Sequence, residues 1–398
     1  MPSYVVGWDL RVYETAVRSL MAGHDPYADG NSLQHLFHSQ PTLHPDHSQP
    51  YTYVYGPITL PLLRIVTIFP LGTVANLYWL AYGACVLIVI WVGMQWVKQD
   101  ERKLFSLLAP ASVFFPGLVH IDTLFSGNVA IVFYGLIFAA TRWGWRTGNW
   151  QCFYIATITA SCCKAPWLIF LLIPILSARK QWLSTCITGV VGIILFAIQH
   201  FLWPSEFNNY LEAINLRLAF NHDFGLSPAG QLADALYYVI PYQITSATFY
   251  AFYASLIFAT LLYLSRKFLC GYISWAQWAP VLFVGVALLL PRIMEYDVAP
   301  IAIPMALIAW RFLGRSNRPT QRILGMSVLF AAVNGIVAIS GLSYNVWKHT
   351  ECVVLVGIFA IGSWDLFMQC RDVNLESSSV SHEAVWARGE EAPQPSPV

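Results

Sequence analysis

The chain has 398 residues, of which 57 % are hydrophobic, 15 % aromatic and only 11 % charged, and its formal net charge is +1. Because soluble domains carry about 25 % charged residues, this composition excludes an ordinary soluble protein and predicts an all-α polytopic membrane protein within a bilayer. The near-neutral charge, without a basic patch interleaved with aromatic residues, gives no support for nucleic acid, and no nucleic-acid partner is predicted.

The first predicted element is an amphipathic helix over residues 9–22, which carries Asp9 on its first turn. Glu14 and Arg18 are four residues apart in the favourable order for an ion pair. Gly23 suits the left-handed position that ends a helix, and Pro26 prevents its continuation. Asp9 is therefore either a simple N-cap or a carboxylate with a function at the lip of the helix. The apolar face of the helix holds Val12, Tyr13, Ala16, Val17 and Leu20.

The polar region 1–54 is predicted to lie outside the membrane. Only eight residues precede Asp9, without a basic region or a long apolar run, so no cleavable signal peptide is predicted. The histidines between His35 and His47 are irregularly spaced in a loop-like segment, so no metal site is predicted, and no cofactor is predicted elsewhere. The eight cysteines lie in or beside apolar segments without ligand spacing, and we interpret them as small buried apolar residues.

Long apolar stretches fill most of residues 55–370, which form the predicted transmembrane domain. The piece from Pro57 to Pro70 is short for a span and contains Arg64, which favours an interfacial or re-entrant segment. About eleven spans are predicted, at 73–97, 104–119, 127–143, 148–163, 165–178, 183–203, 246–265, 273–290, 297–313, 322–342 and 352–369.

Two polar segments complete the predicted organisation. The outer loop 204–245 is predicted to hold an amphipathic helix near 205–220 along the membrane interface. The tail 371–398 is rich in Ser, Glu and Pro without an apolar pattern, which predicts a disordered cytoplasmic tail. One side of the helix in the outer loop would carry Tyr210, Ile214 and Leu218.

The basic loops orient the chain. With eleven spans, every cluster of Lys and Arg falls on one side, which the positive-inside rule assigns to the cytoplasm. The outer face of what is predicted to be the plasma membrane then receives Asp9, Lys164, Arg292 and the loop 204–245. The basic residues on the cytoplasmic side are Lys98, Arg102, Lys103, Arg142, Arg146, Arg179, Lys180, Arg266, Lys267, Arg311, Arg315, Arg318, Arg322 and Arg371.

The residues predicted for the outer face favour a particular chemistry. Lys164 lies between two apolar stretches and Arg292 ends another, and cations at that depth need a partner, for which a phosphate headgroup is suited. A carboxylate such as Asp9 opposite them can deprotonate a hydroxyl as a general base. This combination fits glycosyl transfer from a lipid-phosphate sugar, whereas the simpler interpretation is that charges gather in loops.

The opening helix also resembles a known family. The pattern Asp9-x-x-Val12-Tyr13-x-x-Ala16-x-x-x-Leu20-x-x-Gly23-x-x-Pro26-Tyr27 resembles the opening motif of glycosyltransferase family 87. That family comprises polyprenol-phosphate-mannose-dependent, largely α-1,2-type mannosyltransferases of the GT-C superfamily. Further segments are similar in order, namely Tyr55-Gly56-Pro57, Gly127-Asn128, Lys164-Ala-Pro166 and Pro291-Arg292 through Tyr296 and Asp297.

The resemblance implies a GT-C-like bundle with loop helices on the outer face. It implies a hexosyltransferase that moves a sugar, with mannose expected, from a polyprenyl-phosphate donor to a lipid or glycan acceptor, with Asp9 as the catalytic base. This chain has Gly56 where the family usually has proline, and Tyr296 in a late loop that often holds histidine. The family also has a span before the motif, so the resemblance implies either that the true start lies upstream of Met1 or that the N-terminal tail is translocated unaided. The implied substrate-binding residues are Tyr13, Tyr27, Lys164, His222, Arg292, Tyr296 and Asp297.

Two other classes of protein remain open from the sequence. A polytopic transporter or lipid flippase places ionisable groups near the bilayer midplane and usually has repeated halves with broken helices. The break at Lys164 would suit such a fold, although no convincing repeat is present. A non-enzymatic membrane scaffold, or an inactive homologue, is the third class.

Overall fold

The structure is a computed structural model that describes residues 7–27, 53–112, 126–178, 180–219, 225–236, 239, 242–314, 319–340 and 344–387. Within these ranges every named element is a helix. The helices are α1 (Trp8–Met21), α3 (Thr59–Leu63), α4 (Ile65–Ile68), α5 (Leu71–Met94), α6 (Arg102–Ser112), α8 (Ala130–Thr147), α9 (Gln151–Cys163), η1 (Ala165–Leu171), α10 (Leu172–Ser177), α11 (Trp182–Leu202), α12 (Pro204–Ala219), α13 (Pro228–Leu236), α14 (Tyr242–Leu269), α15 (Trp275–Leu288), α16 (Glu295–Val298), η2 (Ala299–Ile301), α17 (Ala302–Leu313), α18 (Pro319–Ser340) and α19 (Tyr344–Ala387).

The helical architecture is that of an α-helical membrane protein, as predicted. Among the described residues, five segments are long and apolar enough to cross a membrane on their own. Helices occupy all or part of the eleven predicted stretches, but several of them are shorter than a span, so the count of about eleven is not confirmed. The five segments are Leu71–Met94, Trp182–Leu202, Ser246–Leu269, Tyr296–Leu313 and His349–Arg371.

Burial separates central helices from peripheral ones. In the segment Tyr296–Leu313, 78 % of the most apolar window is buried inside the protein, whereas the corresponding share is 22 % in α11 and 17 % in α14. The side chains of α15 are buried continuously from Trp278 to Leu288. A helix that is apolar all round and buried forms the core of a bundle, so α15 and α17 lie at the centre while α11 and α14 face outwards.

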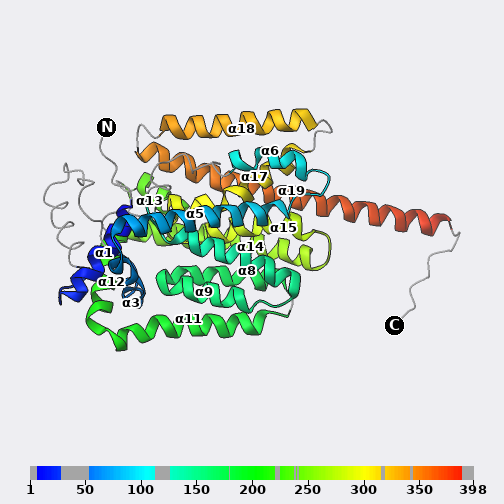
Figure 1. The fold of residues 1–398 in the computed structure, drawn as a ribbon. Helices are drawn as coiled ribbons and strands as arrows, with labels where there is room; N and C mark the ends of the chain where they lie inside the picture. The colour runs from blue at the N-terminus through cyan, green and yellow to red at the C-terminus, as the bar shows by residue number, and fades with distance from the viewer. Residues whose placement is uncertain are drawn as a thin grey trace, which may run out of the picture.

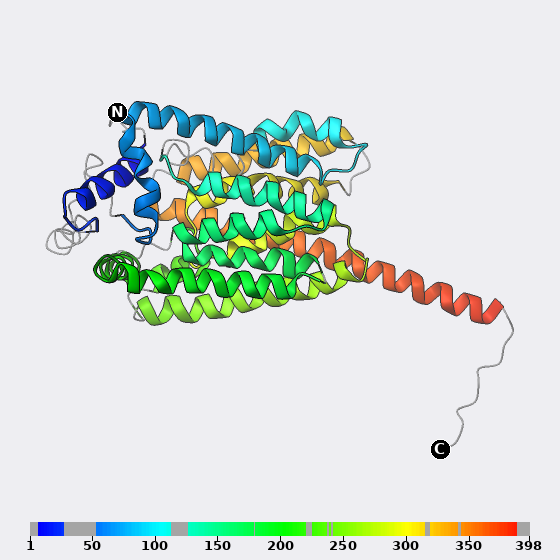
Figure 2. The ribbon, with the colours of Figure 1, turned by 60° about the horizontal axis from the view of Figure 1, so that its bottom comes forward.

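The two ends of the bundle differ in what covers them. Figure 1 shows α1, α3 and α12 grouped at one end, while α19 extends beyond the opposite end. The rotated view in Figure 2 keeps this arrangement, with α1 at the end of the longer helices. Helices α1, α3, α5 and α12 contribute to a second apolar cluster, separate from the main core of the bundle. This second cluster forms the base of the site described below.

Helix α1 follows the amphipathic pattern of its sequence. Val12, Tyr13, Ala16 and Val17 are buried, and Leu20 is partly buried against the same cluster. The predicted pair of Glu14 and Arg18 is formed, with 2.7 Å between Oε1 and Nη2. Gly23 has a φ of 77° after the end of the helix, so the predicted left-handed position is confirmed.

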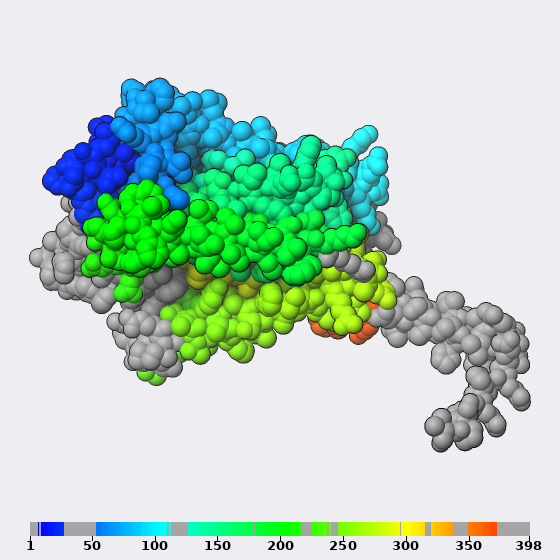
Figure 3. All heavy atoms as spheres, turned by 90° about the horizontal axis from the view of Figure 1, so that it is seen from below, coloured from blue at the N-terminus to red at the C-terminus, as the bar shows by residue number. Residues whose placement is uncertain are grey.

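Helix α12 confirms the helix predicted near 205–220. Its side chains Phe207, Tyr210 and Ala213 are buried in the second apolar cluster, and the rings of Tyr210 and Tyr27 lie 6.1 Å apart. Figure 3 shows that the green surface of α11 and α12 reaches α1 (dark blue) at one end. The predicted face of α12 therefore packs at least in part against protein; the side chain of Leu218 lies outside the described residues.

Two predictions about the chain are wrong. Residues 371–387 continue α19 as a helix, because neither glycine nor proline interrupts the sequence before Gly389, whereas 388–398 lie outside the described residues. The cysteines are all free, but three of them are exposed on the outer faces of apolar helices or at a helix end rather than buried. Lipid can cover such faces, which removes the need for burial in protein. The three are Cys152, Cys186 and Cys270.

Candidate functional site

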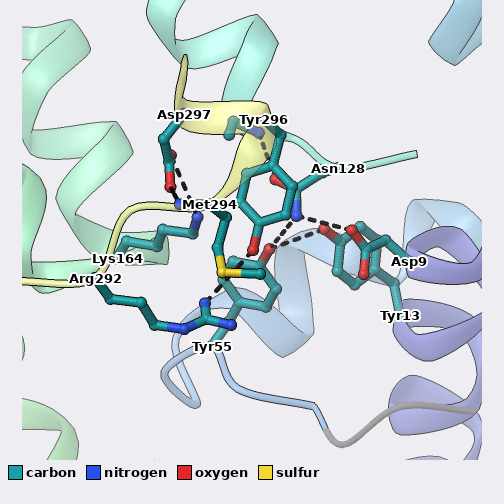
Figure 4. A network of polar contacts seen from close by, with 10 residues as sticks. Asp9, Tyr13, Tyr55, Asn128, Lys164, Arg292, Met294, Tyr296 and Asp297 are labelled. Atoms are coloured by element: carbon teal, nitrogen blue, oxygen red, sulfur yellow. Dashed lines mark hydrogen bonds and ion pairs between the residues drawn. The ribbon is translucent and has the colours of Figure 1, made fainter. Parts of the chain in front are cut away.

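Four separate parts of the chain meet at the α1 end of the bundle. They are the first two turns of α1, the segment that leads into α8, the junction between α9 and η1, and the loop before α16 with α16 itself; Tyr55, from the turn before α3, joins them as a fifth part (Figure 4). The side chains that meet here include six of the eight predicted site residues. We call this group the Asp9 site; its labelled members are Asp9, Tyr13, Tyr55, Asn128, Lys164, Arg292, Met294, Tyr296 and Asp297.

Asp9 is held by the segment that precedes α8. Its backbone N–H donates to the Ser126 carbonyl at 2.8 Å, and its Oδ2 accepts from Nδ2 of Asn128 at 2.8 Å. The N-cap of α1 is Gly7, with a φ of 78°, so the interpretation of Asp9 as an N-cap is wrong. Its carboxylate lies in the first helical turn, where negative charge interacts favourably with the helix dipole.

Tyr13 and Tyr55 continue the contacts of Asp9 into the second apolar cluster. Their hydroxyls lie 3.1 Å apart, and Nδ2 of Asn128 also donates to the Tyr55 hydroxyl at 3.1 Å. Burial raises the pKa of both tyrosines well above the usual range, and the charge of Asp9 adds to the effect. Both phenols therefore stay protonated at ordinary pH and act as hydrogen-bonding groups.

Tyr27 is buried and contacts the Asp9 site through the backbone of Tyr55. Its ring is fully buried, and its hydroxyl donates to the Tyr55 carbonyl at 2.8 Å. The predicted substrate contact of Tyr27 is therefore not available in this arrangement, because no surface of the ring is exposed. Its role here is to position the backbone of Tyr55.

The turn after Tyr55 is held by the peripheral helix α11. Oε1 of Gln199 accepts from the N–H of Ile58 at 3.0 Å, and Gln199 is 2 % exposed. A Cβ added at Gly56 would lie 2.7 Å from that same oxygen. The absence of a side chain at Gly56 thus allows the amide of Gln199 to reach the turn that carries Tyr55.

Lys164 lies in extended backbone between α9 and η1, where Pro166 begins the next helical run. Its Nζ lies 3.7 Å from Oδ1 of Asp297, 4.4 Å from the ring centroid of Tyr296 and 5.3 Å from that of Trp167. Burial lowers the pKa of Lys164, and the charge of Asp297 opposes this shift. The side chain is 16 % exposed, so its charge lies near the surface of the site.

The loop before α16 brings the second cation. Nη1 of Arg292 lies 3.5 Å from the Tyr296 hydroxyl. The N–H of Met294 donates to Oδ2 of Asp297 at 3.1 Å, and a backbone bridge joins Ile293 to Gly225. The loop is therefore fixed at both ends, by its own aspartate and by the segment that leads into α13.

The charges are arranged around the phenol ring of Tyr296. Figure 4 shows this ring in the middle of the group, with Lys164 and Arg292 on one side and Asp9 and Tyr13 on the other. Lys164 lies within electrostatic reach of both Asp9 and Arg292. The arrangement can bind an anion at the two cations and place a hydroxyl near the carboxylate.

Sequence reasoning missed two residues of the site, Tyr55 and Asn128. Both were noted in short motifs, but hydrophobic periodicity cannot show that Asn128 reaches Asp9 across 119 positions. The predicted residue His222 lies outside the described residues, as does the histidine-rich stretch. In the described ranges, no group of three or more His, Cys, Asp or Glu side chains is arranged to hold a metal ion.

No protein-family model, no curated protein and no solved structure matches the chain. The functional assignment therefore depends on the chemistry of the Asp9 site and on the resemblance of the motifs.

Proposed function

We propose that the chain is a membrane glycosyltransferase of the GT-C type, similar to family 87, that acts at the outer face of the plasma membrane. It moves a sugar, with mannose expected, from a polyprenyl-phosphate donor to a lipid or glycan acceptor. In this proposal the shorter helices pair to complete about eleven spans.

The observation that carries the proposal is the placement of one carboxylate opposite two cations. Asp9 lies on one side of Tyr296, and Lys164 and Arg292 lie on the other, although 128 residues separate Lys164 from Arg292 along the chain. In a site exposed to lipid, a phosphodiester is the anion best placed to meet two such cations.

The reaction follows from these roles. Asp9 removes the proton of the acceptor hydroxyl as its oxygen attacks the anomeric carbon, and the bond from that carbon to the phosphate oxygen breaks. Lys164 and Arg292 neutralise the charge of the leaving lipid phosphate. The acceptor attacks from the face opposite the phosphate, so the configuration at the anomeric carbon inverts.

Replacement of the base tests the proposal. Purified protein in liposomes, given a labelled polyprenyl-phosphate sugar and an acceptor extract, should transfer label. Asp9→Asn keeps an oxygen that accepts from Asn128 but removes the base, and it should lower transfer by about a hundredfold or more. Asp25→Asn is the matched control, because Oδ1 of Asp25 only accepts from the N–H of Tyr27, at 2.9 Å, and an amide oxygen can do the same. Transfer that is unchanged in Asp9→Asn would exclude Asp9 as the base.

One observation favours the transporter or flippase as a second candidate. Lys164 interrupts the apolar run between α9 and η1 in extended backbone, as in the broken helices of transporters. Uptake of a solute, or lipid movement, in vesicles without any transfer of label would favour that class over the glycosyltransferase. The same vesicles can be used for both measurements.

A further inference from the structure

Asn128 makes three hydrogen bonds with its side chain, and the chain fixes the direction of all three. Oδ1 accepts from the N–H of Ala130 at 2.9 Å, at the start of α8. Nδ2 lies 2.8 Å from Oδ2 of Asp9 and 3.1 Å from the Tyr55 hydroxyl. A backbone N–H can only donate, so the amide oxygen must face Ala130 and the NH₂ group must face Asp9.

The orientation has a consequence for the carboxylate. An NH₂ group can only donate, and a hydrogen bond donated to a carboxyl group favours its ionised form, which is the form that can accept a proton. The same group also bonds the hydroxyl of Tyr55, so it holds Asp9 at a fixed place relative to the tyrosines. Asn128 is 2 % exposed, which shields these bonds from water.

We propose that Asn128 is the positioning residue of the Asp9 site, which keeps the Asp9 carboxylate oriented and ionised by donating to it from an amide of fixed direction. This inference rests on the proposed function, because it assigns how the base is held ready. It also explains why the amide is needed here, since a carboxylate at the same position would accept from the N–H of Ala130 equally well and could not donate.

Titratable groups from several elements face Asp9. Tyr13, Tyr55, Tyr78 and Lys164 are among those that lie within electrostatic reach of it, and Arg292, Tyr296 and Asp297 belong to the same group of side chains. Burial raises the pKa of Tyr13 and Tyr55, so these two groups do not titrate on the acid limb of a pH profile. Lys164 stays positively charged over the acid limb, so a shift of that limb reports on a carboxyl group of the site.

Asn128→Asp separates the two roles of the side chain. Its carboxylate still accepts from Ala130 N–H, but it places a second carboxyl group at hydrogen-bond distance from Asp9, and such a pair retains a proton to higher pH. The acid limb of kcat/KM should move up by about one pH unit or more, with about a tenfold loss at neutral pH and recovery at higher pH.

Asn149→Asp, just before the start of α9, is the matched control. Oδ1 of Asn149 accepts from the N–H of Gln151 at 3.0 Å, two residues on, as Oδ1 of Asn128 does from Ala130. The control variant should keep the wild-type rate and profile. A purely structural role of Asn128 would lower the rate of Asn128→Asp equally at every pH, and that result would overturn the proposal.

A second variant keeps the test decisive if Asn128→Asp does not fold. Asn128→Ser keeps a hydroxyl that can accept from the N–H of Ala130, but its side chain is too short to donate to Asp9 in the same way. Because the carboxylate loses its donor, this variant should lower the rate and move the acid limb up, and a wild-type rate and profile would overturn the proposal. If the wild-type protein transfers no sugar, the proposed function fails instead, so the two failures are distinct.

Discussion

Charged side chains gather at both ends of the bundle, but they are paired in different ways. The run α16–η2–α17 carries Asp297 at one end and Arg311 at the other, 14 residues apart, which is about 21 Å of helix. We call the second group the Arg322 cluster; it comprises Glu101, Trp310, Arg311 and Arg322.

The Arg322 cluster is closed by short contacts. Nη1 of Arg322 lies 2.8 Å from Oε1 of Glu101, its Nε donates to the Trp310 carbonyl at 2.8 Å, and its guanidinium lies 3.8 Å from the Trp310 ring centroid. Arg311 donates to the carbonyls of Gln277 and Trp96. These contacts join α15, α17 and α18 to the segment between α5 and α6, so the cluster holds these elements together.

The ion pair that Lys164 makes in the Asp9 site is longer. Nζ of Lys164 and Oδ1 of Asp297 are 3.7 Å apart, beyond hydrogen-bond distance, and that buried oxygen has no hydrogen-bond partner. The contact from Arg292 to the Tyr296 hydroxyl is 3.5 Å. The comparison teaches that polar residues at one end hold helices together by short contacts, while the Lys164–Asp297 pair at the other end leaves one carboxylate oxygen without a hydrogen-bond partner.

The largest effect is expected from a matched pair of glycines. Gly225 has a φ of 60°, and a Cβ there would overlap the carbonyl oxygen of Ile293 next to Arg292. Gly225→Ala should therefore cost about 3 kcal/mol or more of unfolding free energy and displace the loop of the Asp9 site. Gly148→Ala, with a φ of 73° and nothing within 4 Å, should cost about 1 kcal/mol. Unfolding in detergent measures both, and equal losses would contradict the expected difference.

Two arginines, one in the Arg322 cluster and one in the Asp9 site, test the contrast between the two ends of the bundle. Arg322→Ala removes an ion pair, a ring contact and a backbone hydrogen bond, and it should cost about 2 to 3 kcal/mol of unfolding free energy. Arg292→Ala should cost less than about 1 kcal/mol, because the side chain of Arg292 is only partly buried whereas Arg322 is 9 % exposed. Binding of a polyprenyl-phosphate sugar should show the reverse order, with loss only in Arg292→Ala. If Arg292→Ala is the less stable variant, the contrast between the two ends is wrong.

The smallest expected effect is the pH dependence of stability that comes from Glu101 in the Arg322 cluster. Burial works to raise the pKa of Glu101, but hydrogen bonds from Arg322 and Trp310 outweigh it and lower that pKa below the usual value. A lowered pKa in the folded state gives stability that is present above the unfolded value, about 4.3, and is lost as the pH falls through the folded value. The thermal midpoint of the wild type should therefore fall in acid more than that of Glu101→Gln. Parallel curves for the two proteins would exclude this contribution.

The sequence predicted most of the helices and the meeting of distant charges. The topology derived from the basic loops placed Asp9, Lys164 and Arg292 on one face, and the structure brings them together because α9 and α15 both end there. Hydrophobic periodicity was sufficient for α1, whose buried face has a regular spacing.

The remaining features depend on contacts that no local pattern encodes. The bond from Asn128 to Asp9 spans 119 positions, and the bond from Gln199 to Ile58 spans 141. Asp9 itself has the residue type of an N-cap, but Gly7 takes that position because its φ is positive. The span count could not be fixed from hydropathy, because the helices α9, η1 and α15 are apolar yet shorter than a bilayer requires.

The close approach of Gln199 to Gly56 has a consequence for how this sequence can vary. A side chain at position 56 would displace the oxygen of Gln199 and remove the acceptor of the Ile58 N–H. Positions 56 and 199 are therefore expected to covary among homologous chains, with proline at 56 accompanied by a smaller residue at 199. In any search for distant relatives, the two positions carry one shared signal, because a change at one alters the contact made by the other.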